Sequence, residues 1–244
     1  MLACLLATGC GTTLVGKVFR PESYVVRRGD TLYSIAWRYG IDHQSLMRWN
    51  GISNPRNLQP GVRLYLWPGR HGGDGDDGAT ATADSGSSGG GGSGGSGGST
   101  AAASDDQAGG REEPQPPPSG GPDAWRWPAD GEVVGTFGNG AVAGRGIDIS
   151  GRSGQAIRAA AGGEVVYSGA GLEAYGRLLI IRHEGDFLSA YAHNRELLVG
   201  EGARVEAGQR IAVMGENRDG RPLLHFEIRH GGSPVDPARY LPAR

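Results

Sequence analysis

The stretch Phe187-Leu188-Ser189-Ala190-Tyr191-Ala192-His193 decides the fold of the C-terminal half of this chain. It reads as a β-strand, and residues 163–167 and 178–183 before it are strand-like runs of similar length. Glycines that favour turns separate such runs at positions 169, 171, 176, 185, 208 and 215. Short strands between glycine turns predict a mostly antiparallel β domain, which we place at residues 124–242.

Two short motifs on either side of this stretch carry the chemistry of the domain. Residues 144–148 read Gly-Arg-Gly-Ile-Asp, and residues 223–227 read Leu-Leu-His-Phe-Glu. With the strand that ends at His193, these motifs resemble the LytM, or lysostaphin-like, peptidoglycan endopeptidases, whose metal motifs are His-x-x-x-Asp and His-x-His. The resemblance implies that Asp148 and His225 match two zinc ligands and that His193 matches a catalytic histidine.

Two residues depart from the family pattern and remove half of that chemistry. Gly144 stands where the first histidine is expected, and Leu223 where the third is expected. A catalytic zinc site keeps three protein ligands and an open position for water, and neither of these residues has an atom that binds a metal. Recruiting His193 as a third ligand would use up the remaining catalytic histidine. We therefore expect no catalytic residue beyond a vestigial His193, no metal at the vestigial Asp148 and His225, and no cofactor.

The residues around the lost metal site suggest that the groove has kept its shape after its reaction was lost. A cleft that held an extended peptide retains its hydrogen-bonding groups when the metal is absent. We therefore expect it to bind a protein partner. The candidate contacts are Arg145, Asp148, Tyr191, His193, Arg221 and His225.

Residues 24–66 read as a smaller, separate module. Residues 24–27 and 63–65 have the composition of strands, a helical apolar period begins at Leu32, and a second helix is expected over residues 43–49. This order, β-α-α-β, resembles the LysM domain, which binds glycans containing N-acetylglucosamine, such as peptidoglycan.

The loop Arg28-Gly29-Asp30-Thr31-Leu32 matches the Gly-Asp-Thr-Leu turn of LysM domains. We expect Asp30 to cap the first helix and Gly40 to end it. The resemblance implies a shallow sugar groove in which the loop backbone makes most of the contacts. Its lining residues are Gly29, Asp30, Thr31, Leu32, Asn54 and Leu58.

Residues 69–123 lie between the two units and contain no Val, Ile, Leu, Met, Phe, Tyr or Trp. Such a segment cannot bury enough apolar surface to offset chain entropy, so it is expected to be a disordered Gly/Ser/Pro-rich linker. Its root-mean-square span would be on the order of 40 Å. That span would let one unit stay bound to the cell wall while the other moves until it meets its own binding partner.

Residues 1–10 read as a signal segment, because Ala7-Thr8-Gly9-Cys10 resembles a bacterial lipobox. In a lipobox the signal peptide is cut before the cysteine, which then carries lipid. We expect Cys10 to be lipidated and, since Gly11 rather than Asp follows it, the protein to lie at the outer membrane, facing the periplasm. The family prefers Leu at the position of Ala7, and no basic region precedes the short apolar stretch. A signal truncated by a misplaced start codon explains both departures, and a frayed N-terminus without function is the alternative.

Charge and hydropathy exclude two other classes of protein. The net charge of -2 gives no long-range attraction for nucleic acid. Apart from the first residues, no run approaches the roughly 18 apolar residues of a membrane span.

A lipobox, a LysM module, a tether and a LytM domain without its zinc residues, in this order, resemble the NlpD-type murein hydrolase activators. The resemblance implies a non-catalytic protein that binds peptidoglycan and a periplasmic N-acetylmuramoyl-L-alanine amidase. It would relieve the self-inhibition of the amidase at the division septum, so that daughter cells separate. Two alternatives remain: an active zinc metalloendopeptidase that cleaves peptidoglycan cross-links, and a passive wall-binding lipoprotein whose LytM domain is a spacer.

Overall fold

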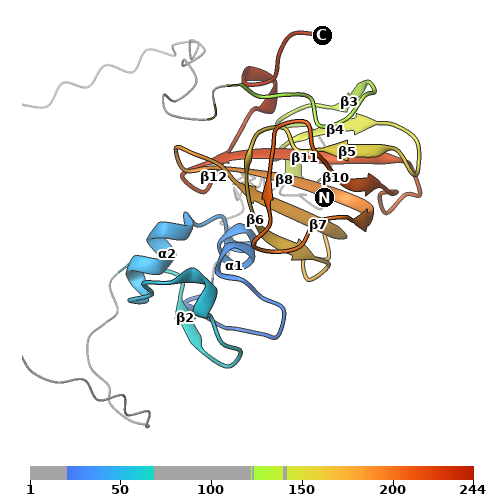
Figure 1. Cartoon of the computed structure of the whole chain (residues 1–244). Coiled ribbons are helices and arrows are strands. Elements are labelled where there is room, and N and C mark those ends of the chain that lie inside the picture. Colours follow the sequence, from blue (N-terminus) through green and yellow to red (C-terminus); the bar gives the residue numbers. More distant parts are fainter. Residues whose placement is uncertain (1–20, 69–121, 123, 140–141) are drawn as a thin grey trace, which may run out of the picture. The chain divides into compact units, whose positions relative to one another are not determined.

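The computed structural model describes residues 21–68, 122, 124–139 and 142–244 (Figure 1). The predicted signal segment with Cys10, and nearly all of the predicted linker, lie outside these residues. Within the described part of the chain, no helix has the length and apolar content needed to cross a membrane.

The N-terminal module has the order β-α-α-β (blue to cyan in Figure 1). Its two strands are antiparallel, with Tyr24 opposite Leu64. The predicted second helix and closing strand are confirmed at their bounds. The elements are β1 (Ser23–Val25), α1 (Leu32–Tyr39), α2 (His43–Trp49), the 3-10 turn η1 (Pro55–Asn57) and β2 (Arg63–Tyr65).

The cap of α1 differs from the prediction. Thr31, not Asp30, is the N-cap: its hydroxyl accepts from the Ser34 N–H, and Ser34 Oγ accepts from the Thr31 N–H, each at 3.0 Å. The Asp30 carboxylate instead accepts from the Arg27 N–H at 2.8 Å and from the Tyr24 hydroxyl at 2.7 Å, so it closes the turn before the helix. The predicted stop is confirmed, because Gly40 ends α1 in the left-handed conformation, with φ 60°.

The C-terminal domain is a mostly antiparallel β domain, as predicted (Figure 1). The sheet has ten strands. Seven of them pair in the order β3-β4-β11-β8-β7-β6-β9, while β10 pairs with β5 and β8, and β12 pairs with β11. The central strands β11 and β8 therefore have partners on both sides. The strands are β3 (Val133–Gly135), β4 (Ile147–Ser150), β5 (Ala156–Arg158), β6 (Gly163–Gly169), β7 (Arg177–Arg182), β8 (Phe187–Leu197), β9 (Arg204–Val205), β10 (Arg210–Met214), β11 (Leu223–His230) and β12 (Ser233–Val235), with 3-10 turns η2 (Val142–Gly144) and η3 (Pro237–Arg239).

Strand β11 separates an apolar face from a polar one. Leu224, Phe226 and Ile228 are fully buried in the main hydrophobic core. His225 and Glu227 alternate with them and are also fully buried, on the opposite face. Since successive side chains of a strand point to opposite faces, the core fixes which residues of β11 can form a site.

Candidate functional site

Asp148 and His225 meet near the middle of the C-terminal sheet. Strands β4 and β11 are antiparallel neighbours, and His225 lies directly opposite Asp148. Asp148 Oδ1 lies 2.7 Å from His225 Nδ1, and the two residues are only 5% and 0% exposed. The two side chains that the family resemblance assigns to a metal are therefore hydrogen-bonded to each other.

Glu227 engages the second ring nitrogen of His225. His225 Nε2 lies 3.1 Å from Glu227 Oε1, which also accepts from the Tyr175 hydroxyl at 2.8 Å. Glu227 Oε2 accepts from Arg229 Nη2 at 2.9 Å. A buried carboxylate is costly unless donors surround it, and these three side chains provide them. A carboxylate on the far nitrogen of a histidine also fixes the orientation of its ring.

The charges of His225, Glu227 and Arg229 stabilise one another. Burial opposes a charge on His225, but hydrogen bonds with Asp148 and Glu227 outweigh it and raise the pKa of the ring. Burial also opposes ionisation of Glu227, yet the hydrogen bond to His225 and the charge of Arg229 lower its pKa. Burial and the nearby Glu227 carboxylate raise the pKa of Tyr175 to about 12, so its hydroxyl stays a donor. With an acceptor at each nitrogen, His225 is best satisfied as an imidazolium, which has no lone pair for a metal.

His193 lies beside this pair in an uncommon backbone conformation. Strand β8 pairs first with β11 and then with β10, and His193, where the partner changes, has φ 62°. Its N–H donates to the Tyr175 carbonyl, and its carbonyl accepts from the Gly215 N–H, both at 2.9 Å. The ring centroids of His193 and His225 are 6.3 Å apart. Burial, and then the charge of His225, lower the pKa of His193 to about 4, so this ring is neutral near pH 7.

The side chains at this centre do not fit a zinc ion. Gly144 and Leu223 have no donor atoms, which leaves Asp148 and His225 as ligands. Two ligands of a tetrahedral zinc, each about 2.1 Å from it, lie about 3.4 Å apart, whereas the two atoms here are 2.7 Å apart. Among the described residues, no group of three or more His, Cys, Asp or Glu side chains is arranged to hold a metal ion.

The three remaining predicted groove residues have different environments. Arg145 is half-buried in the turn between η2 and β4, and exposed Arg221 pairs with Asp219 at 3.1 Å in the loop before β11. Tyr191 does not line the groove. It is fully buried in the core, where its hydroxyl accepts from the Ala160 N–H at 2.8 Å.

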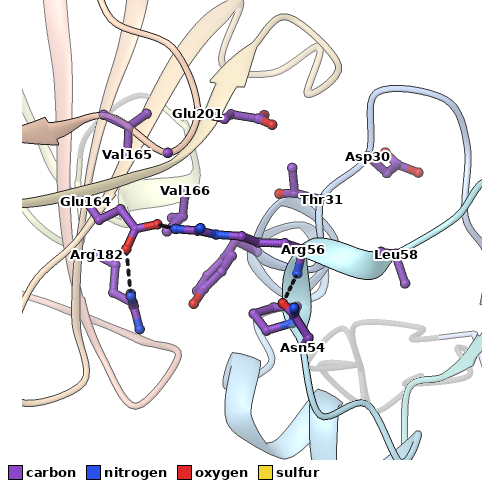
Figure 2. A pocket seen from close by; sticks show the side chains of 13 residues that line it. Asp30, Thr31, Asn54, Arg56, Leu58, Glu164, Val165, Val166, Arg182 and Glu201 are labelled. Carbon is purple, nitrogen blue, oxygen red and sulfur yellow. Dashed lines mark hydrogen bonds and ion pairs between the residues drawn. The ribbon is translucent and has the colours of Figure 1, made fainter.

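Four predicted glycan-binding residues of the LysM-like module, Asp30, Thr31, Asn54 and Leu58, come from the loop before α1 and from the turn around η1 (Figure 2). The Asn54 side chain accepts from the Arg56 N–H at 3.0 Å and so shapes the turn of η1, drawn as a dashed line in Figure 2. The predicted lining residue Gly29 is exposed in the turn before α1, with φ 85°.

Leu32 does not line the sugar groove. Its side chain is 0% exposed and packs in the core of the LysM-like module with Ile35, Leu46 and Leu64. Leu32 is the first residue of α1 and belongs to the apolar face of that helix, as the helical apolar period predicted.

Sequence reasoning missed the roles of Glu227, Arg229 and Tyr175. The signal for two of them was present: His225, Glu227 and Arg229 recur at every second position, and the residues between them, Phe226 and Ile228, are apolar. Three ionisable residues on one face of a central strand must satisfy one another, because no water reaches them. Tyr175 comes from a distant loop, and only the fold brings its hydroxyl to Glu227.

Comparisons with known proteins agree with both domain resemblances. Residues 24–67 match the model of the LysM domain, and residues 142–237 match that of peptidase family M23. The NlpD/LppB lipoprotein homologue of Pseudomonas aeruginosa is 45% identical over 234 residues, which cover 91% of this chain and 77% of that protein.

Two further relatives extend the comparison. The murein hydrolase activator NlpD of Salmonella typhimurium is 38% identical over 261 residues, covering 91% of this chain and 69% of that protein. The uncharacterized lipoprotein YgeR of Escherichia coli is 36% identical over 242 residues, covering 98% of this chain and 89% of that protein. With its LysM domain and its peptidase-like M23 domain, the chain belongs to the NlpD/LppB family of lipoproteins.

Proposed function

We propose that this protein is a non-catalytic activator of a murein hydrolase, namely a periplasmic N-acetylmuramoyl-L-alanine amidase. The observation that carries the proposal is the 2.7 Å hydrogen bond between Asp148 and His225, which stands where a zinc peptidase would hold its metal. The name of the Salmonella relative, a murein hydrolase activator, supports the same conclusion.

The LysM domain would hold peptidoglycan, and a lipid on Cys10 would hold the chain at the outer membrane on its periplasmic side. The amidase would then be activated at the division septum, where peptidoglycan is split between daughter cells. The lipoprotein names of the relatives support the lipid anchor.

Activation requires the chain to bind the active form of the amidase better than the inhibited form. A hundredfold preference corresponds to about 2.7 kcal/mol. Arg145 and Arg221 are the more accessible of the proposed contacts, while Asp148, His193 and His225 are buried. A partner segment with carboxylate side chains would pair with these guanidinium groups.

Two other functions compete with this proposal. An active zinc endopeptidase would need a third metal ligand, and neither Gly144 nor Leu223 has a donor atom. A passive wall-binding lipoprotein would bind peptidoglycan without changing the rate of any hydrolase, so a rate measurement separates it from an activator.

The experiment measures dye release from labelled peptidoglycan sacculi by the amidase, with the full chain and with two charge-reversal variants. Wild type should accelerate release, and Arg145→Glu should lower the acceleration at least about tenfold, equivalent to 1.4 kcal/mol of binding. The matched control is Arg210→Glu. Arg210 is exposed and is the first residue of β10, and this variant should activate like wild type. No acceleration by wild type would refute the proposal, and equal activity of both variants would move the contact away from Arg145.

A further inference from the structure

The site that matches the family's metal centre differs from it in more than the two missing histidine side chains. We propose that its backbone no longer admits a side chain at position 144, so that returning histidines to positions 144 and 223 would not return zinc. This inference concerns the chain alone and does not depend on any partner.

The first obstacle is the backbone around Gly144. Gly144 has φ 66°, and its carbonyl accepts from the Gly138 N–H at 2.8 Å. A Cβ atom added to Gly144 would lie 2.8 Å from the Gly138 carbonyl carbon and 2.9 Å from its oxygen, closer than Cβ atoms approach other atoms in proteins. Both are backbone atoms, so no side-chain rotation relieves the contact.

The second obstacle is that the segment cannot move away from Gly138. Two residues further on, a Cβ atom at Gly146 would lie only 2.2 Å from the Phe226 carbonyl oxygen of β11. The backbone of this turn is thus packed directly against the central strand on one side, while Gly144 meets Gly138 on the other. A shift that gives room to a side chain at 144 would break one of these two contacts.

The third obstacle is the pair that would have to receive the metal. Asp148 is held from its other side by β3, where a Cβ atom at Gly135 would lie 2.5 Å from Asp148 Oδ2. His225 is held through Glu227 at 3.1 Å. Opening the Asp148–His225 distance from 2.7 Å to the roughly 3.4 Å of a tetrahedral zinc site therefore means moving the Asp148 carboxylate from its place against β3 or the His225 ring from Glu227.

Position 223 is different, which makes it a useful contrast. Leu223 has the regular strand geometry of β11, opposite Ser150, and a side chain is already present there. We therefore expect a histidine to be accepted at 223 and refused at 144. The two positions therefore differ: the backbone excludes a side chain at 144 but not at 223.

The experiment compares full-length variants by thermal unfolding and by zinc content. Gly144→Ala should unfold at a lower temperature than the matched control Gly220→Ala by roughly 5 °C or more. The control has a similar φ of 74°, but nothing lies within 4 Å of its added Cβ, so it carries the backbone strain without the clash. The variants Leu223→His and Gly144→His/Leu223→His, dialysed after exposure to zinc, should both hold far less than one zinc per chain.

Two results would overturn the proposal. Equal unfolding temperatures of Gly144→Ala and Gly220→Ala would show that position 144 has room for a side chain. One firmly held zinc per chain in Gly144→His/Leu223→His would show that the backbone accepts the restored site. If the double variant does not fold, the two alanine variants decide the question by themselves.

Discussion

Replacing Glu227 by glutamine should lower the free energy of unfolding of the C-terminal domain by about 3 kcal/mol. The carboxylate accepts from the Tyr175 hydroxyl, from His225 Nε2 and twice from Arg229. A glutamine keeps one acceptor oxygen, and its NH₂ group must face either Arg229 or the other two donors. At least two buried donors then lose their acceptor at about 1–3 kcal/mol each, and the ion pair with Arg229 is broken.

The assay is chemical denaturation of the full chain, followed by near-ultraviolet circular dichroism. Tyr175→Phe removes one donor to the same carboxylate and should cost less, about 1.5 kcal/mol. The control is Glu206→Gln at an exposed position, which should stay within about 0.5 kcal/mol of wild type. A Glu227→Gln chain as stable as wild type would refute the view that these groups form one mutually satisfied network.

Three further predictions concern pH, the cell wall and metal. Burial lowers the pKa of His183 to about 4, against 6.5 when exposed, so the unfolded chain takes up a proton that the folded chain refuses. The contribution of His183 to stability should therefore fall by about 3 kcal/mol between pH 6.5 and 4, and His183→Gln should make the pH dependence of stability less steep by this amount in denaturation series at different pH. Asn54→Ala should lower co-sedimentation of the full chain with sacculi while Ser53→Ala does not, and equal pelleting would remove Asn54 from the glycan site. The wild-type chain, dialysed at neutral pH, should contain no stoichiometric zinc on metal analysis, and one zinc per chain would revive the peptidase alternative.

Local sequence patterns predicted much of the fold. The second helix of the LysM-like module and its closing strand begin and end where the sequence indicates, because apolar periodicity and turn residues act locally. The cap of the first helix was predicted one residue too early. Asp30 and Thr31 are both good caps by type, and the Tyr24 hydroxyl, which comes from a strand outside the loop, engages Asp30 and leaves Thr31 for the helix.

The site was less predictable, because it depends on backbone geometry that residue types do not reveal. Regular alternation along β8 would put Tyr191 and His193 on the same face. The positive φ of His193 interrupts the alternation, so that its ring approaches His225 while Tyr191 stays in the core. Likewise, Gly144 was predicted only as a missing ligand. Its contact with the Gly138 backbone appears only once the turn is folded.

We propose that this chain makes a hydrolase cut peptidoglycan without cutting it itself. The most direct test of this proposal is mass spectrometry of the products released from sacculi by the full chain alone, by the amidase alone and by both together. We expect no cleaved bonds with the chain alone, and more free stem peptides, cut from the glycan strands, when the chain joins the amidase. Cleaved peptide cross-links in the sample with the chain alone would contradict the proposal.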